Sequence, residues 1–239
     1  PAGYKSIPID TPNDRIIVMA RLSFEDTSWV AAELNEWRSM IYTVDDTSMT
    51  YHTPVNKGRE SLAYLQYIVD HYYSLPSLII FLHSHRSGWP QAWHTDTFDY
   101  SNVESVRLLR PDFVQKNGYV NLRCMDDPGC PAEIRPFRDP PDEGREAELY
   151  YARAYQELFN TSTVPEEVGV ACCSQFAVSR DQVLKRPHSD YLRFYTWVLT
   201  TDLSDETVSR IMEYSWHIIF GMDAVYCPDV YQCYREVYG

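Results

Sequence analysis

Three of the seven histidines in this chain fall within twelve residues, directly after an apolar run with the composition of a buried strand. His83 and His85 follow the run 77–82, and His94 comes shortly after them. Alternate residues of an extended chain point to one side, so His83 and His85 are expected to project together. Open α/β sheets bind ligands beyond the carboxyl ends of their strands. We therefore predict that all three histidines are catalytic and that His83 and His85 can bind a metal. The alternative is a polar loop with each histidine hydrogen-bonded locally.

Two further polar groups are expected to face the same cleft. Asp45 and Asp46 end a second strand, where carboxylates can accept hydrogen bonds from ribose hydroxyls or base N–H groups. An Asx-capped turn would explain them equally well. Gly58, Arg59 and Glu60 begin a helix, and a helix N-terminus with a nearby arginine can bind phosphate. The alternative is an ordinary N-terminus with Arg59 paired to a carboxylate.

The last long helix is expected over about 204–220 and places Glu213 and His217 four residues apart on one face. A carboxylate beside an imidazole can form an acid/base pair, and Glu213 is the candidate base. The alternative is a core histidine with its hydrogen bonds satisfied. Further candidate substrate-binding residues near these groups are Arg86, Trp93, Asp96, Gln175, Arg180 and Trp216. No Gly-x-Ser-x-Gly elbow, P-loop or dinucleotide fingerprint is present, which argues against the commonest hydrolases, kinases and dehydrogenases.

The elements that must position these residues alternate in type along the chain. Strand-like runs at 15–20, 41–45 and 77–82 are separated by helical patterns, which predicts a mostly parallel central sheet flanked by helices. We expect a single α/β domain over 1–239. Its first half, 15–100, is expected to resemble a nucleotide-binding unit, and its second half, 101–239, to complete the cleft.

Composition and charge limit the classes of partner. The chain has 239 residues and a net charge of -13, so binding to a phosphate backbone is not expected. The 19 tyrosines and 6 tryptophans suit either a core with amphipathic rings near the surface or a pocket lined by rings. No apolar run is long enough to span a membrane. Because the chain begins at Pro1 without a Met, membrane association is expected only through a segment outside it.

Six cysteines point to an oxidising compartment, and we predict a secreted or lumenal protein. Two pairs flank short turn-rich loops, which predicts the disulfides Cys124–Cys130 and Cys227–Cys233. The adjacent Cys172 and Cys173 lie in an apolar run and are expected to be buried thiols. The sequence Asn160-Thr-Ser is a weak indication of glycosylation, in agreement with this location.

A set of ordered motifs resembles a largely fungal family known only as domain-of-unknown-function family 3431. The resemblance covers nearly the whole chain but implies no activity. The motifs that carry it lie at 56–60, 75–76, 81–85, 93–94, 118–124, 128–131, 172–180 and 216–221.

More distantly, segments 15–20 and 42–48 resemble the opening of GT-A-type glycosyltransferases. This resemblance implies a GT-A-like (Rossmann-like) fold and a nucleotide-facing role for Asp45 and Asp46. Those enzymes usually carry Asp-x-Asp for their metal, and here His83-Ser-His85 occupies that place. Paired histidines suit a softer transition metal or none.

Together, these observations predict an enzyme that transfers a sugar from an activated donor, with a small-molecule or sugar substrate. A divalent metal is the one cofactor expected. A first alternative is a biosynthetic enzyme that uses the same pocket for cyclisation or cycloaddition, without nucleotide. A second is a non-catalytic carbohydrate-binding or host-interaction protein.

Overall fold

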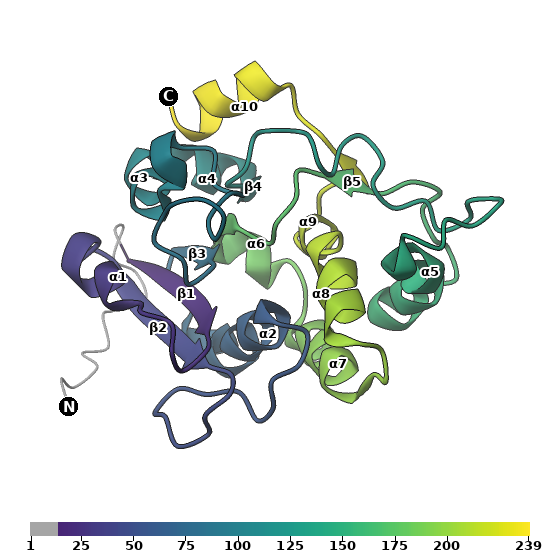
Figure 1. Cartoon of the computed structure of the whole chain (residues 1–239), viewed down its shortest axis with the longest axis horizontal. Helices are drawn as coiled ribbons and strands as arrows, with labels where there is room; N and C mark the ends of the chain where they lie inside the picture. Colours follow the sequence, from purple (N-terminus) through teal and green to yellow (C-terminus); the bar gives the residue numbers. More distant parts are fainter. Residues whose placement is uncertain (1–13) are drawn as a thin grey trace.

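The structure is a computed structural model that describes residues 14–239, so the expectation attached to Pro1 lies outside it. Its centre is a five-stranded sheet (Figure 1). In spatial order the strands are β2 (Arg38–Thr43), β1 (Arg15–Arg21), β3 (Leu78–Leu82), β6 (Phe176–Ser179) and β4 (Tyr119–Asn121).

The central sheet is mixed, which corrects the prediction of a mostly parallel sheet. β1 pairs in parallel with β2 and β3, whereas β6 pairs antiparallel with both β3 and β4. The reversal arises because the chain enters β6 from the end of the sheet at which β3 finishes, so that Phe176 pairs with Phe81. The start of β6 and the end of β3 therefore lie together.

Alternation along the strands divides the core into two layers. In β3, Ile79 and Phe81 face one layer, while Leu78, Ile80 and Leu82 face the other. The first layer includes residues of α2 (Glu60–His71), α5 (Glu146–Phe159), α6 (Arg180–Leu184), α7 (His188–Thr200), α8 (Asp205–Glu213) and α9 (Trp216–Ile219). The second includes residues of α1 (Ser28–Glu33), α3 (Asn102–Leu108), α4 (Pro111–Asn117) and α10 (Val230–Val237).

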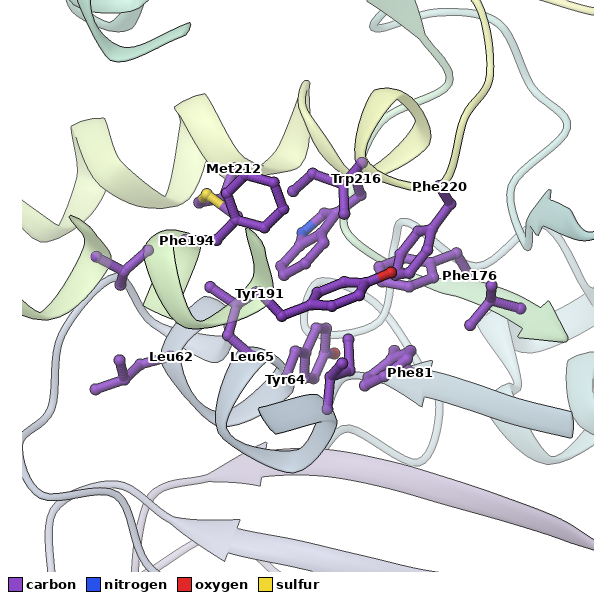
Figure 2. Packing of buried hydrophobic residues seen from close by; sticks show 14 of the residues in the cluster. Leu62, Tyr64, Leu65, Phe81, Phe176, Tyr191, Phe194, Met212, Trp216 and Phe220 are labelled. Atoms are coloured by element: carbon purple, nitrogen blue, oxygen red, sulfur yellow. The ribbon is translucent and has the colours of Figure 1, made fainter. Parts of the chain in front are cut away.

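The first layer contains a dense group of aromatic rings (Figure 2). The ring of Phe81 lies 4.8 Å from that of Tyr64 and 4.9 Å from that of Phe176, measured between centroids. Trp216, only 1% exposed, continues the group at 5.4 Å from Phe176. Many of the abundant aromatic residues thus fill the core, and Trp216, a candidate substrate-binding residue, lies among them rather than in a cleft.

The helix expected over 204–220 is interrupted. α8 ends at Glu213 and the short α9 begins at Trp216, with Tyr214 and Ser215 between them. Tyr151 on α5 donates a hydrogen bond to the Tyr214 carbonyl, and the Ser215 hydroxyl donates to the Ile211 carbonyl. These contacts stabilise the break, so Glu213 and His217 do not share a helix face.

The disulfides differ from the predicted pairing. Cys124 bonds to Cys233 and Cys130 to Cys227, so the two turn-rich loops are linked to each other instead of each being closed on itself. This pairing is possible because α10 packs beside α4 and the C-terminal segment folds back over the middle of the chain (Figure 1). A small parallel ladder between β5 (Gly169–Val170) and β7 (Val225–Tyr226) holds the same segment.

The adjacent Cys172 and Cys173 form a third disulfide and are not free thiols as expected. Three disulfides are typical of proteins that fold in an oxidising compartment. Within residues 14–239, no helix is both long and apolar enough to cross a bilayer.

Candidate functional site

The carboxyl ends of β1, β2 and β3 surround a cavity of about 310 Å³, which we call the histidine cavity. Its position agrees with the expected site for ligands in an open α/β sheet. His83 and His85 both line it, as expected for alternate residues that continue a strand. The full lining is Ala20, Arg21, Leu22, Glu25, Val44, Asn56, Arg59, Glu60, His83, Ser84 and His85.

His94 lies behind His83 and contacts it directly. His83 Nδ1 and His94 Nε2 are 3.1 Å apart and share a hydrogen bond. Burial lowers the pKa of His83 to about 4, helped by the nearby His85 and Arg59. Burial also lowers the pKa of His94 to about 2, with His83 adding to the effect. Both rings are therefore neutral near pH 7, and a single proton lies between them.

His85 is half-buried and faces Glu25, whose carboxylate lies 3.9 Å from the imidazole Nδ1. Between the two histidines, the Ser84 carbonyl accepts a hydrogen bond from the indole N–H of Trp29. This contact with α1 fixes the backbone just beyond β3. The turn after the strand is thus held rigidly enough to define where His83 and His85 point.

Arg59 and Glu60 begin α2 at the mouth of the histidine cavity. Arg59 is exposed, and its guanidinium makes no ion pair with any residue that the structure describes. Glu60 accepts a hydrogen bond from the Ser209 hydroxyl, and the Ser174 side chain lies close enough to oppose the rise of its pKa. Burial raises the pKa of Glu60, although its hydrogen bonds and Arg59 act in the opposite direction. A cation without an ion-pair partner among the described residues and a carboxyl with a raised pKa are therefore neighbours.

Gly58 serves the packing of α2 against α8. Its N–H donates to Asp205, and a Cβ at this position would lie 2.8 Å from a methyl group of Val208. Its φ of +63° also favours glycine. Because Asp205 already accepts the Gly58 N–H, this N–H is not available to a ligand. Arg59 is therefore the group at this helix start that can bind an anion.

Glu213 lies at the end of α8, in a second and larger cavity of about 740 Å³, which we call the carboxylate cavity. Arg59 lines both cavities. The carboxylate cavity is lined by Arg59, Glu133, Ile134, Asp142, Glu143, Gly144, Arg145, Glu146, Ala147, Glu206, Thr207, Ser209, Arg210 and Glu213.

The Glu213 carboxylate is 10% exposed and is held at both oxygens. One accepts a hydrogen bond of 2.6 Å from the Cys173 N–H, and the other accepts one of 3.1 Å from Arg210. Burial nevertheless raises the pKa of Glu213; Arg210 opposes the shift and the nearby Glu60 adds to it. The sequence analysis missed both Arg210, which lies one helical turn before Glu213, and the backbone donor at Cys173.

The backbone at the Cys172–Cys173 disulfide is unusual. Cys173 and Ser174 both have positive φ values, 96° and 51°, which few residues other than glycine adopt. This turn directs the Cys173 N–H to Glu213 and places the Ser174 side chain near Glu60. The adjacent cysteines are the sequence feature that could have indicated this turn. Their adjacency does not show that the turn would contact Glu213 and Glu60.

Gln175 and Arg180 lie at opposite ends of the short β6, although both were expected in the cleft. Gln175, just before the strand, accepts a hydrogen bond of 3.0 Å from the His83 N–H. Arg180, just after it, has its N–H bonded to the Ser77 carbonyl at the start of β3. Because β6 is antiparallel to β3, the structure brings Gln175 to the histidines and places Arg180 at the far edge of the sheet.

Several other candidates line neither cavity and are held by structural partners. Asp45 accepts hydrogen bonds from the N–H and hydroxyl of Ser23, and Asp46 from those of Ser48. Arg86 forms a two-bond ion pair with Glu33. Asp46 thus fits the turn-forming alternative, whereas Asp45 bonds to Ser23, which is 22 residues away in the sequence. Both carboxylates follow Val44, which lines the histidine cavity.

The remaining candidates are also held by neighbouring residues. Asp96 accepts hydrogen bonds from the N–H groups of Cys124 and Met125 and from the Tyr234 hydroxyl. Trp93, 38% exposed, lies under the guanidinium of Arg123.

His217 is buried, and its Nε2 donates to the Ala224 carbonyl. Burial lowers its pKa to about 4. It makes no hydrogen bond or ion pair with Glu213, and its surroundings match those of a core histidine.

The donor sets offer little support for a metal site. Within residues 14–239, one group of three ligand-type side chains lies close enough, with its atoms within 4.8 Å: Cys172, Cys173 and Glu213. Its two sulfurs bond to each other and are not thiolates, the form that binds metal. Among the described residues His83 and His85 do not form such a group with a third ligand, although Glu25 lies 3.9 Å from His85.

Comparisons with known proteins add one finding. Neither the curated proteins nor the solved structures contain a match to this chain. Residues 17–236 match a family described as "protein of unknown function (DUF3431)". Because the match spans nearly the whole chain, the protein belongs to this family.

Proposed function

We propose that the protein is an enzyme that transfers a sugar from a phosphate-activated donor to an acceptor hydroxyl. The observation that carries this proposal is the position of Arg59. Its guanidinium makes no ion pair with a residue in 14–239, and Arg59 lines both the histidine cavity and the carboxylate cavity, which contains Glu213. Volumes of about 310 and 740 Å³ fall within the range of small-molecule sites.

The charges of the two cavities suggest which part of the reaction each one serves. In the carboxylate cavity, the acidic residues Glu133, Asp142, Glu143, Glu146, Glu206 and Glu213 outnumber the basic residues Arg59, Arg145 and Arg210. This excess repels phosphate and suits a neutral acceptor. The donor phosphate would bind in the histidine cavity, with Arg59 as its cation and the neutral His83 imidazole beside it.

The chemistry then requires one proton transfer and one displacement. The acceptor hydroxyl gives its proton to the Glu213 carboxylate while its oxygen bonds to the anomeric carbon. The bond from that carbon to the phosphate oxygen breaks, and the electron pair leaves with the phosphate, whose charge Arg59 stabilises. The raised pKa of Glu213 makes its carboxylate a stronger base than an exposed one.

The finer assignments belong to this proposal as well. A GT-A-like fold is supported by parallel β1, β2 and β3 with a cleft at their carboxyl ends. A secreted or lumenal location is supported by the three disulfides. The polar lining of the carboxylate cavity favours sugar transfer over the cyclisation alternative, which needs an apolar, ring-lined pocket for a hydrocarbon chain.

A binding titration tests the proposal. Uridine and guanosine diphosphates and their glucose and mannose conjugates would be titrated by calorimetry, with and without Mn²⁺. Loss of one charge-assisted contact is expected to weaken binding by about tenfold to a hundredfold in Arg59→Gln. The matched control is Arg153→Gln, because Arg153 is 84% exposed on α5 and lines neither cavity. Absence of binding by the unaltered protein, or equal loss in both variants, would reject the proposal.

A further inference from the structure

The disulfide between the adjacent Cys172 and Cys173 lies beside the carboxylate of Glu213. The two sulfurs and one carboxylate oxygen all lie within 4.8 Å of one another. The Cys173 N–H donates to the same carboxylate at 2.6 Å, which fixes the position of the turn relative to Glu213. While the sulfurs are bonded to each other they cannot bind a metal, but as two thiolates they would complete a set of three ligands.

This disulfide is expected to be reduced more readily than the other two. Folding stabilises a disulfide as much as the disulfide stabilises the fold, and this gain grows with the length of the closed loop. Adjacent cysteines close the shortest loop, whereas the other pairs are 109 and 97 positions apart. Of the six cysteines, all within residues 14–239, only Cys173 has a positive φ, which adds conformational strain. Cys173 is also partly exposed, and strained or exposed disulfides are the labile ones.

The charge of the carboxylate cavity favours a cation at this place. Glu213 is one of six acidic residues that line the cavity, against three arginines. Arg210, which contacts Glu213, also pairs with Glu133, so two acids offset its charge. Two thiolates next to Glu213 would add further negative charge. A divalent cation would therefore be attracted to these ligands.

We propose that reduction of Cys172–Cys173 opens a site for a thiophilic divalent cation such as Zn²⁺, with the two thiolates and the Glu213 carboxylate as its ligands. A dithiol supplies the two electrons. Its own sulfurs form a disulfide, the Cys172–Cys173 bond breaks, and the two protons of the dithiol pass to the new thiols. The cation then displaces both protons to solvent as it binds. Sulfur and carboxylate oxygen both suit zinc, and the fourth position of a tetrahedral site stays open for water.

A bound cation would also affect the proposed function, and this consequence is the one part of the inference that rests on that function. A carboxylate oxygen that binds a cation cannot accept a proton from an acceptor hydroxyl. Sugar transfer would therefore proceed in the oxidised protein and stop in the reduced, metal-bound protein. Binding of the cation itself does not depend on sugar transfer.

The first experiment identifies the disulfide that opens. The folded protein is treated with a limiting amount of dithiothreitol, its free thiols are alkylated, and the labelled positions are located by peptide mass spectrometry. Cys172 and Cys173 are expected to be labelled before the other four cysteines. Earlier labelling of either long-range pair would overturn the inference.

The second experiment measures metal binding by the selectively reduced protein, after removal of the dithiol without oxygen. Co²⁺ is the probe, because thiolate ligands give it a charge-transfer absorption, and Zn²⁺ is expected to displace it. The reduced protein is expected to bind one equivalent, and the oxidised protein is expected to show no such absorption. Absence of the absorption from the reduced protein would also overturn the inference.

A matched pair of variants tests the third ligand. Glu213→Gln removes the charged oxygen, so the affinity of the reduced protein for Zn²⁺ should fall by more than the tenfold to hundredfold, roughly, that loss of a ligand's hydrogen-bond partner costs. Glu206→Gln is the control, because Glu206 lies on the same helix and lines the same cavity but is not in the group of three. Equal losses would show that Glu213 is not a ligand. Because no nucleotide or sugar is used, failure of the proposed function leaves these results intact.

Discussion

Glu148 and Glu213 are two buried carboxylates on helices that pack against each other, yet their pKa values shift in opposite directions. Glu148, 2% exposed on α5, bonds through both oxygens to Arg138 and also accepts the Arg135 N–H. Burial raises the pKa of Glu148, but these bonds outweigh it, and the net shift is downward. For Glu213, burial outweighs Arg210 and the Cys173 N–H, and the net shift is upward.

The difference lies in how completely the charge is compensated. Arg138 binds Glu148 through two nitrogens, in the fork geometry that matches a carboxylate. Arg210 offers one nitrogen to Glu213 and another to Glu133, so its charge is shared between two acids. A fully compensated carboxylate holds structure together, whereas an incompletely compensated one that lines a cavity is available for proton transfer.

The largest expected effect is on turnover. Glu213→Gln keeps the shape of the side chain but removes its capacity to accept a proton, so sugar transfer should fall by about a hundredfold to ten-thousandfold, with donor affinity nearly unchanged. Turnover is measured by mass spectrometry of the product and affinity by calorimetry. Glu104→Gln on the exposed face of α3 is the control and should be silent. If Glu213→Gln retains full turnover, Glu213 is not the base, and its raised pKa has no role in the reaction.

The second effect should appear in stability and not in turnover. Glu148→Gln loses charge-assisted hydrogen bonds to Arg138 and the Arg135 N–H, and the free energy of unfolding should fall by about 2–3 kcal/mol. Urea denaturation measures this change. The exposed pair of Glu33 and Arg86 supplies the control, because Glu33→Gln should have a much smaller effect. If the two variants lose equal stability, Glu148 is no more than a surface carboxylate.

The histidine cavity could be predicted from the sequence because its geometry is local. A buried strand followed by His83-Ser-His85 places both imidazoles at the carboxyl edge of the sheet, and strand periodicity sends them to one side. The hydrogen bonds that join His94 and Gln175 to His83 could not be predicted, because these residues are 11 and 92 positions away from it in the sequence. The direction of β6, which brings Gln175 there, is a property of the whole sheet.

The environment of Glu213 could not be predicted from the sequence either, because it also depends on contacts between distant segments. Helical periodicity continues from Ser204 to Phe220, and only a contact from α5 to the Tyr214 carbonyl reveals that the helix breaks. Disulfide connectivity likewise depends on which loops meet in space. Short turn-rich loops favoured local closure, but the packing of α10 brought Cys233 to Cys124 instead.

A third, smaller effect concerns Arg210, the cation beside Glu213. Arg210→Met removes a positive charge from Glu213, so the pKa of the base should rise further and the acid limb of the pH–rate profile should move to higher pH. Stability should change by no more than about 1 kcal/mol, because Arg210 is 41% exposed. An acid limb that stays in place would mean that Glu213 is not the group whose ionisation controls the rate.

The smallest effect is a difference of sign in how stability depends on pH. The lowered pKa of Glu148 contributes stability that is present above its ordinary value of 4.5 and is lost as the pH falls through the lowered value. The raised pKa of Glu213 acts in reverse: its contribution is present below 4.5 and is lost as the pH rises through the raised value.

Relative to the unaltered protein, Glu148→Gln should therefore be least stable at neutral pH and recover on acidification. Glu213→Gln, which resembles the protonated acid, should gain relative stability as the pH rises above 4.5. Unfolding free energies measured across this range give both differences, and slopes of the same sign would show that the two carboxylates are compensated alike.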